Sequence, residues 1–488
     1  MLFRGLYCWA LSAALVAAPA AGADSLRAAL ELRAEYAAEL EKLARWCTEN
    51  GLRAEAQTTR RLIVPIDPYK LYVPTLPAAV GPPKLPDNAP PAVVQWDARL
   101  WQLRREHAGK LFEMARRAVR NGQAGLAFEM ALAALQANPD HEAARRVFGF
   151  QKYKDQWRSL DEIRRLRAGQ VWSEKFGWLP KAHLPRYEKG ERYFNGRWIS
   201  AAEDAKLHAD IQSGWDIESE HYLVRTNHSL EAAVGLIEKL ERLHRVWRLL
   251  FIRYYATPES LAALFEGRAR AALPSFPRHH VVLFRDREDY IRALQPAMPK
   301  IDISSGVYVE QTRRAYFFVA EEPDDRTMYH EATHQLFHEL RPTAPNVARK
   351  ANFWIIEGIA MYMESLHSEE GYEVLGGLDD ERMRAACYRL LQDGFYVPLE
   401  EFVSYGMERW QNDLRIATLY SQAAGLTHFL VHYDSGRYRE ALLRYLLAVY
   451  EGRDQLDTLA QLTGVSYAEL DEQYREFIEA EKMPVKKN

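Results

Sequence analysis

A proline-dense stretch near the N-terminus limits what this chain can fold into. The segment PIDPYKLYVPTLPAAVGPPKLPDNAPP, within residues 63–91, cannot continue a helix, because proline lacks the backbone N–H donor and its ring clashes with the preceding turn. Residues 25–62 before it and 98–148 after it carry Leu and Ala at helical spacing. The sequence therefore predicts two helical stretches joined by an extended loop or linker.

The second helical stretch has the features of a helix hairpin. Ala124, Ala127, Ala131 and Ala134 recur at positions that suit close helix packing, and Asn138-Pro139-Asp140 then breaks the pattern and starts another helix. This unit resembles a tetratricopeptide-type hairpin. A repeat array needs three or more copies, so an ordinary helix hairpin explains the pattern equally well.

A short sequence pattern then occurs twice. Residues 153–162 and 194–203 each contain an aromatic residue, a polar turn, a Trp and then a Ser-x-x-acid helix cap. Asn195-Gly196 favours a tight hairpin turn. We expect two small hairpin-plus-helix modules with a structural role, and a binding role is the alternative.

From about residue 215 the pattern predicts mixed α and β structure. Strands are expected over residues 221–226 and 279–284, with a helix capped by Ser229 between them, and a hairpin over residues 306–319. The chain after Glu357 is expected to be mostly helical. With 488 residues, two or three domains are expected. The predicted class is α+β, mostly helical, with a small mixed sheet in the C-terminal part.

The N-terminus predicts export. Arg4 gives a positive start, residues 6–18 are apolar, and Ala21-Gly22-Ala23 suits signal-peptide cleavage. An N-terminal membrane anchor is the alternative, but the apolar run is short for a span and ends at Pro19. We therefore expect a periplasmic or extracellular protein with no stable membrane span after cleavage.

The net charge and the cysteine positions argue against two classes of function, nucleic-acid binding and a cysteine-based metal site. The formal net charge of −3 argues against nucleic acid as the main partner. Cleavage would leave Cys47 and Cys387, which lie far apart in the sequence and have no metal-ligand spacing. In an exported protein they could pair, and two separate buried thiols are at least as good an interpretation.

The segment MYHEATHQLF contains His330, Glu331 and His334 in the order H-E-x-x-H. Met328 to Leu340 contains no Gly or Pro, so a helix is expected, and its pitch places the two imidazoles about 6 Å apart along one face. Two imidazoles so placed can bind one Zn²⁺, and the intervening carboxylate can act as base on a zinc-bound water.

A third ligand follows in WIIEGIAMYME. Glu357 lies 23 positions after His334 and shares one face of a second expected helix with Glu364. Catalytic zinc needs three protein ligands and one open position, and two His with one Glu form a known set for peptide hydrolysis.

H-E-x-x-H followed by W-x-x-E-G-x-A-x-Y-x-E resembles the gluzincin metallopeptidases, especially the aminopeptidase N branch and its peptidase-MA-like relatives. The chain is also similar to an uncharacterised bacterial family of exported gluzincin-type proteins of unknown function. The resemblance covers roughly residues 215 to 480. It implies ligand roles for His330, His334 and Glu357, a base role for Glu331, and for Glu364 a role in orienting a ligand histidine.

The resemblance also implies a tyrosine that stabilises the oxyanion. Tyr420, in LYSQAAGLTHFL, is the candidate, and a buried core tyrosine is the alternative interpretation. The chain departs from the aminopeptidase N pattern in two ways. The gap between His334 and Glu357 is longer, and the Gly-x-Met-Glu-Asn segment that binds a free amine is replaced by Gly306-Val-Tyr-Val-Glu310. Endopeptidase action therefore becomes more plausible than aminopeptidase action.

Other candidates have weaker support as ligands. His338 would lie about 12 Å along the helix from His330, too far to share an ion. His279 and His280 are expected to be core or solvated residues at a strand start, and Tyr362 a packing residue.

The sequence thus predicts a signal peptide (1–23), a helical region (24–150) with a proline-rich linker (63–91), hairpin modules (151–212) and a gluzincin-like domain (213–484). The predicted function is a zinc metallopeptidase acting on peptide or protein substrates, with a protein partner conceivable at the N-terminal helices. The alternative is a non-catalytic helical interaction protein with a vestigial metallopeptidase-like domain.

Overall fold

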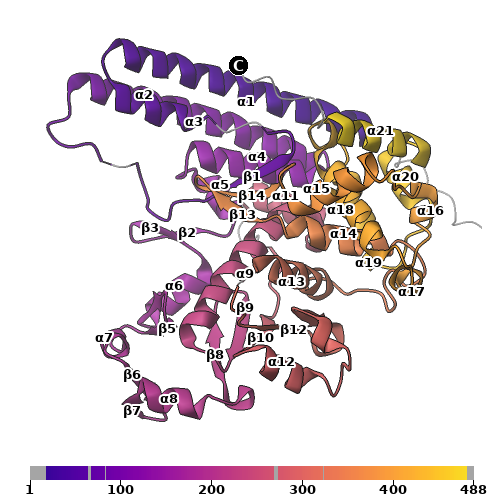
Figure 1. Ribbon diagram of the computed structural model, residues 1–488. Coiled ribbons are helices and arrows are strands. Elements are labelled where there is room, and N and C mark those ends of the chain that lie inside the picture. Colours follow the sequence, from indigo (N-terminus) through magenta and orange to yellow (C-terminus); the bar gives the residue numbers. More distant parts are fainter. Residues whose placement is uncertain (1–17, 64–66, 83, 269–272, 323, 481–488) are drawn as a thin grey trace, which may run out of the picture.

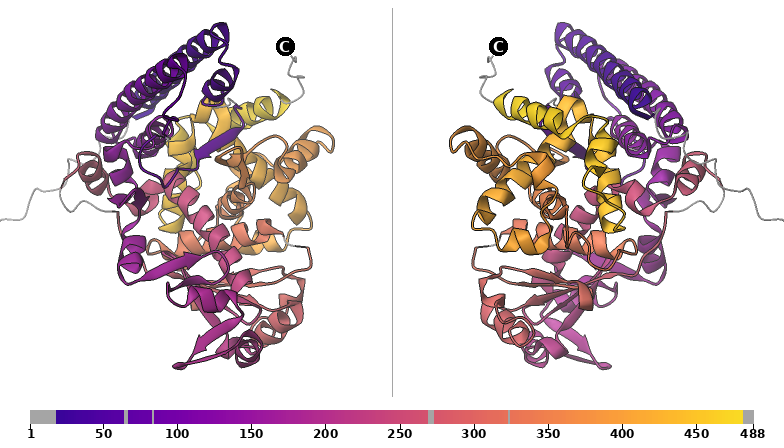
Figure 2. Two further views of the ribbon diagram at one scale, coloured as in Figure 1. Left: turned by 90° about the vertical axis from the view of Figure 1, so that its left-hand side faces the viewer. Right: turned by 90° about the vertical axis from the view of Figure 1, so that its right-hand side faces the viewer.

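The computed structural model describes residues 18–63, 67–82, 84–268, 273–322 and 324–480 (Figure 1). The predicted signal peptide lies mostly outside these described residues. The fold is α+β and mostly helical, with small sheets, as predicted. The N-terminal helices occupy one end of the molecule and the hairpin modules the other (Figure 2). In the described part of the chain, no helix is both long enough and apolar enough to cross a bilayer.

Five helices precede the hairpin modules: α1 (Ala18–Glu49), α2 (Arg53–Arg60), α3 (Pro91–Arg120), α4 (Ala124–Ala137) and α5 (Glu142–Val147). Helices α3 and α4 form the predicted hairpin, and fully buried alanines such as Ala115, Ala127 and Ala131 line their contact. Pro91 stands in the first turn of α3, where a missing N–H donor costs nothing. The pairs α1–α2 and α3–α4 are fewer than the three units that a repeat array needs.

The prediction of a loop or linker over residues 63–91 was incomplete. The segment contains strand β1 (Lys70–Pro74), which pairs antiparallel with β14 (Tyr372–Gly376), next to β13 (His367–Glu369). As an edge strand, β1 can tolerate Pro74. The expectation of a mostly helical chain after Glu357 likewise missed the hairpin β13–β14. The early proline-rich segment is therefore attached to the C-terminal half of the chain by backbone pairing.

Three hairpin modules are present, one more than predicted. They are β2 (Gln151–Tyr153) and β3 (Gln156–Arg158) with α6 (Leu160–Arg167); β4 (Gln170–Ser173) and β5 (Gly177–Pro180) with α7 (Leu184–Glu188); and β6 (Glu191–Phe194) and β7 (Arg197–Ser200) with α8 (Ala201–Leu207). The predicted caps are confirmed, because Ser159 and Ser200 accept from the backbone N–H groups three residues later.

A five-stranded mixed sheet lies beyond the modules, in the order β11-β12-β10-β9-β8. Its strands are β8 (Trp215–Glu218), β9 (Tyr222–Thr226), β10 (His279–Phe284), β11 (Val307–Val309) and β12 (Arg314–Phe318). The three central strands are parallel, and both outer strands are antiparallel to their neighbours. All the strands predicted here are confirmed.

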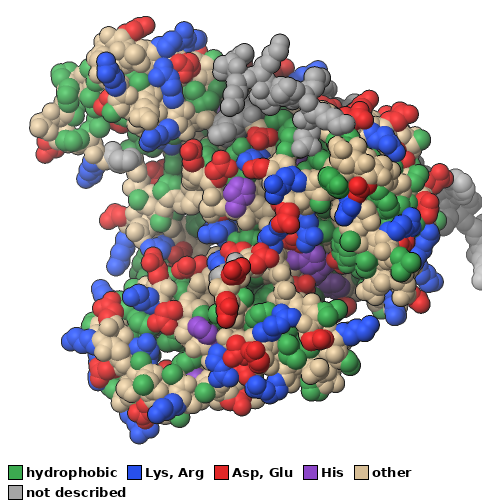
Figure 3. Space-filling view, viewed as in Figure 1, with side chains coloured by type: hydrophobic (Ala, Val, Ile, Leu, Met, Phe, Trp, Pro, Cys, Tyr) green, Lys and Arg blue, Asp and Glu red, His purple; other side chains and the backbone are tan. Residues whose placement is uncertain are grey.

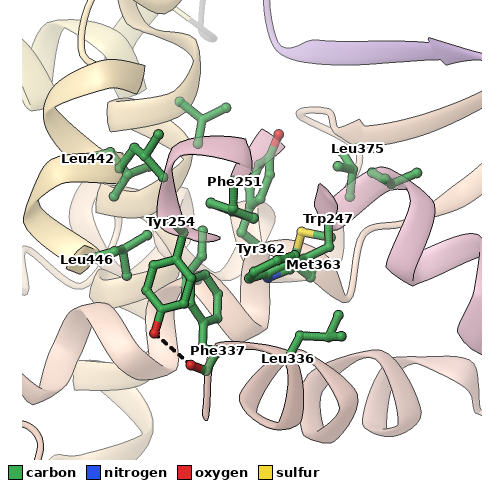
Figure 4. Packing of buried hydrophobic residues seen from close by; sticks show 14 of the residues in the cluster. Trp247, Phe251, Tyr254, Leu336, Phe337, Tyr362, Met363, Leu375, Leu442 and Leu446 are labelled. Carbon is green, nitrogen blue, oxygen red and sulfur yellow. Dashed lines mark hydrogen bonds between the residues drawn. The ribbon is translucent and has the colours of Figure 1, made fainter. Parts of the chain in front are cut away.

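Helices cover both faces of this sheet. Val281 and Phe317 belong to the large core with α9 (Leu230–Leu250) and α13 (Asp325–Glu339), whereas Val282 and Phe284 pack with α12 (Arg287–Leu294). Figure 4 shows Trp247 of α9, and Phe251 just after α9, against Phe337 of α13, and ring centroids lie 5.0 Å apart in both pairs. This alternation of core-facing residues fixes α13 against the sheet.

The remaining helices form the C-terminal half: α10 (Ile252–Tyr255), α11 (Pro258–Phe265), α14 (Phe353–Met363), α15 (Glu381–Leu391), α16 (Leu399–Phe402), α17 (Met407–Gln411), α18 (Ile416–Gly436), α19 (Arg439–Tyr450), α20 (Thr458–Thr463) and α21 (Tyr467–Glu479). Short 3-10 turns span Ile211–Ser213, Ile301–Ile303 and Glu310–Thr312. Among the helices, α14 packs against both α13 and α18.

Candidate metal centre

Helix α13 carries the two histidines of the H-E-x-x-H segment. Asp324 caps the helix by accepting from the backbone N–H of Arg326, and the helix ends at Glu339, shortly before Pro342. The helix predicted over residues 328–340 is therefore confirmed. His330 and His334 face the same side, and their Nε2 atoms lie 3.1 Å apart.

Helix α14 brings a carboxylate to these two nitrogens. Glu357 Oε2 lies 3.5 Å from His330 Nε2, and its Oε1 lies 3.8 Å from His334 Nε2. The three side chains thus form a group of the size that can hold one metal ion. Histidine atoms are visible at a hollow of the surface near the place of α13 (Figure 3).

These separations can be compared with what an ion requires. Tetrahedral coordination with bonds of about 2.0–2.1 Å places neighbouring ligand atoms roughly 3.4 Å apart. The observed spacings of 3.1, 3.5 and 3.8 Å lie around this value. The two imidazole planes are inclined at 78°, so both rings can direct a nitrogen lone pair to one point. The donor set therefore fits a divalent ion such as zinc.

Glu364 orients the first histidine from behind. Its Oε1 lies 2.8 Å from His330 Nδ1, and its side chain is only 2% exposed. A carboxylate in this position makes Nδ1 the protonated nitrogen and leaves Nε2 as a free ligand atom. Arg382 of α15 holds Glu364 with two hydrogen bonds, from Nε at 2.8 Å and from Nη2 at 3.1 Å. Arg382 was not predicted from the sequence, because it lies outside the paired motif.

Electrostatics in the centre favour a positive charge. Burial lowers the pKa of His330, but hydrogen bonds with Glu357 and Glu364 outweigh burial and raise it to about 10. His334 lacks that support, and burial lowers its pKa to about 4. Burial acts to raise the pKa of Glu357, but its contacts with both histidines outweigh burial and lower the pKa below its usual value. The carboxylates thus stabilise a cation at the ligand atoms.

Glu331 lies beside the centre without being part of the ligand group. Its Oε2 accepts a hydrogen bond of 2.8 Å from the backbone N–H of Tyr308 in β11. Burial raises the pKa of Glu331 to about 7, although His330 and the Tyr308 N–H act in the opposite direction. A carboxyl group that titrates near neutrality can accept and return a proton in the same reaction cycle.

Tyr420 of α18 also reaches the centre. A hydrogen bond from its hydroxyl is among the contacts that lower the pKa of Glu357, and burial raises the pKa of the hydroxyl itself. Its ring packs edge-on against Trp410, with ring centroids 5.5 Å apart. Tyr420 is therefore half-buried: its ring packs against Trp410, and its hydroxyl donates a hydrogen bond to the candidate ligand Glu357.

The other candidate residues lie away from the ligand group. His338 Nδ1 is 3.6 Å from Glu310 Oε1, and its ring contacts Tyr308 and Tyr450. His279 is buried, with its Nδ1 2.7 Å from Glu339 Oε2, and His280 is exposed. Tyr362 is a buried core residue whose hydroxyl lies 3.0 Å from His432 Nε2.

A second group of two histidines and one glutamate was not foreseen. His221, just before β9, meets Glu241 and His244 of α9 within the distance that ligand atoms of one metal ion could span. The Glu241-x-x-His244 spacing, i and i+3 on a predicted helix, was the available signal. The two imidazoles stack, however, with centroids 3.8 Å apart and planes inclined at 26°. Lone pairs in nearly parallel planes do not converge on one ion.

Part of the chain matches a family model of unknown function. A family model described as "Protein of unknown function (DUF1570)" matches residues 325–451, a segment that contains α13, α14, α15 and α18. No curated protein matches the chain. Cys47 and Cys387, whose pairing the sequence left open, are both buried, and no disulfide joins one to the other.

Proposed function

We propose that this chain is an exported, zinc-dependent metallopeptidase. The observation that carries the proposal is the convergence of His330 Nε2, His334 Nε2 and the Glu357 carboxylate, with spacings of 3.1 to 3.8 Å. Glu331 adds a buried carboxyl beside these three candidate ligands. Export is supported by the signal-like residues 1–23.

Bound zinc would supply a Lewis acid that polarises a carbonyl group and makes water a better nucleophile at neutral pH. Glu331 would accept the proton of the attacking water and later give it to the leaving amine. The Tyr420 hydroxyl would donate a hydrogen bond to the oxygen on which negative charge develops. Glu364 would keep His330 protonated at Nδ1 throughout.

The sheet offers a place for an extended substrate. Strand β11 is an outer strand of the sheet and pairs with β12 alone among the described strands. An extended peptide could add to its free edge by backbone hydrogen bonds. The Tyr308 N–H on this strand already binds Glu331, which brings such a peptide next to the base. Because the free-amine motif of the aminopeptidase branch is absent, we favour cleavage within a chain.

The test is digestion of a peptide library by the purified mature chain, with and without a metal chelator. The proposal expects cleavage that the chelator abolishes and that added zinc restores. The variant Glu331→Gln should keep its zinc and lose turnover. Chelator-insensitive cleavage, or full activity in Glu331→Gln, would reject the mechanism. Bound zinc without any cleavage would instead favour a vestigial centre in an interaction protein.

A further inference from the structure

The Glu364 carboxylate is surrounded by positive side chains from two helices. Arg382 of α15 binds it through Nε and Nη2, and Arg326 Nε, one turn before His330 on α13, lies 3.5 Å from Oε2. The Glu364 side chain is 2% exposed, whereas that of Arg382 is 41% exposed. A buried carboxylate is therefore bound by a partly exposed arginine.

The position of Arg382 is itself fixed. Asp380 caps α15 by accepting from the backbone N–H groups of Arg382 and Met383, at 2.9 and 3.1 Å. This cap sets the first turn of the helix. The planar guanidinium then meets the carboxylate through two donors, a geometry that restricts both groups. A continuous chain of contacts runs from Asp380 through Arg382 and Glu364 to His330 Nδ1.

We infer that Arg382 is a positioning residue for the metal centre, acting on His330 through Glu364. The inference rests on the proposed function and deepens it. Arg382 does not reach the ligand atoms. It holds the Glu364 carboxylate in place through two hydrogen bonds, so that Glu364 accepts a hydrogen bond from His330 Nδ1–H and His330 presents Nε2 to the ion. Arg326 contributes less, because 3.5 Å is long for a hydrogen bond and its Nη1 is engaged with Glu381.

The test is the zinc dissociation constant, measured by competition with a chelator of known affinity. Loss of an outer partner of a ligand histidine typically weakens metal binding by roughly 10- to 100-fold. We expect an increase in Kd of about this size for Arg382→Gln and a smaller one for Arg382→Lys, which keeps the charge without the planar fork. Arg389→Gln is the matched control, because Arg389 lies on the same helix, is 42% exposed and pairs with Asp393.

A double-mutant cycle separates positioning from a general effect on the fold. If Arg382 acts through Glu364, then Arg382→Gln should change the Kd little in a chain that already carries Glu364→Gln. The melting temperature of the metal-free variants should stay close to that of Arg389→Gln. Equal zinc affinity in Arg382→Gln and Arg389→Gln, or additive effects of the two substitutions, would overturn the inference and leave the proposed function standing. Absence of zinc binding by the unaltered chain would overturn both.

Discussion

In the described part of the chain, two regions each bring two histidines and one glutamate within metal-binding distance, and they differ in how the rings and the carboxylate are arranged. In the centre formed by His330, His334 and Glu357, the rings are inclined at 78° and the carboxylate oxygens face the two Nε2 atoms. In the group of His221, Glu241 and His244, the rings stack at 26°. Residue type and proximity alone therefore do not define a metal site.

Hydrogen bonding separates the two regions further. Both Glu241 oxygens are engaged by His221, Oε1 by the backbone N–H at 2.8 Å and Oε2 by Nδ1 at 2.7 Å. Among the described residues, no backbone N–H donates to the Glu357 carboxylate. The Nδ1 atom of His330, on the side of the ring away from Glu357, is bound by Glu364. In the centre of His330, His334 and Glu357, the ligand atoms can therefore face a common point. In the group of His221, Glu241 and His244, the polar atoms instead join α9 to the start of β9.

The largest expected difference between the two regions is in zinc retention. His334→Ala removes one of the three proposed zinc ligands, so the purified variant should retain no zinc after dialysis. His244→Ala should retain as much zinc as the unaltered chain. Elemental analysis of both variants measures this. Equal zinc loss in the two variants would remove the distinction drawn between the regions.

The next largest effect concerns the base. Glu331→Gln should lower peptide hydrolysis by about 10²- to 10⁴-fold, the usual contribution of a general base, while zinc content stays the same. Glu241→Gln, in the stacked region, should leave the rate within about twofold. Initial rates on one cleaved library peptide give the comparison. A comparable loss of rate in Glu241→Gln would mean that the second region also takes part in the reaction.

A smaller effect is expected on stability. Glu241→Ala would leave two donors of His221 without their partner, at a cost of about 1–3 kcal/mol. Glu238→Ala is the control, because Glu238 is exposed and lies one turn earlier on α9. Thermal unfolding should show a melting temperature a few degrees lower for Glu241→Ala only. An unchanged melting temperature would contradict the structural role of the stacked region.

The smallest effect concerns the thiols. Cys47 and Cys387 are buried in different parts of the fold, and no disulfide joins them to each other. A reducing agent should therefore shift the melting temperature by no more than about 1 °C. A large decrease would show that a disulfide stabilises the chain after all.

The sequence predicted the parts of the fold that depend on local pattern. The period of the apolar residues located α9, and the run without Gly or Pro over residues 328–340 located α13. Ser159, Ser200 and Ser229 were found as helix caps. It did not predict that Lys70–Pro74 pairs with Tyr372–Gly376, because strand pairing across three hundred residues depends on the assembled core and not on the local pattern.

The same limit applies to the candidate centre. His330 and His334 could be named because their spacing reflects the helical period, and Glu357 because it stands on a second expected helix and completes a known ligand set of two His and one Glu. Arg382 could not be named, since its contact with Glu364 depends on where the first turn of α15 lies relative to the end of α14, and no fixed spacing encodes that. The stacked region was missed for a related reason, as His221 and Glu241 meet only when β9 lies against α9.

A crystal structure of the zinc-loaded protein, with anomalous scattering recorded at the zinc absorption edge, tests the central claim most directly. The account predicts one strong anomalous peak, about 2.0–2.2 Å from His330 Nε2, His334 Nε2 and a Glu357 oxygen, with no protein atom at a fourth position. A peak between His221, Glu241 and His244, or no peak at either group in fully loaded crystals, would contradict it.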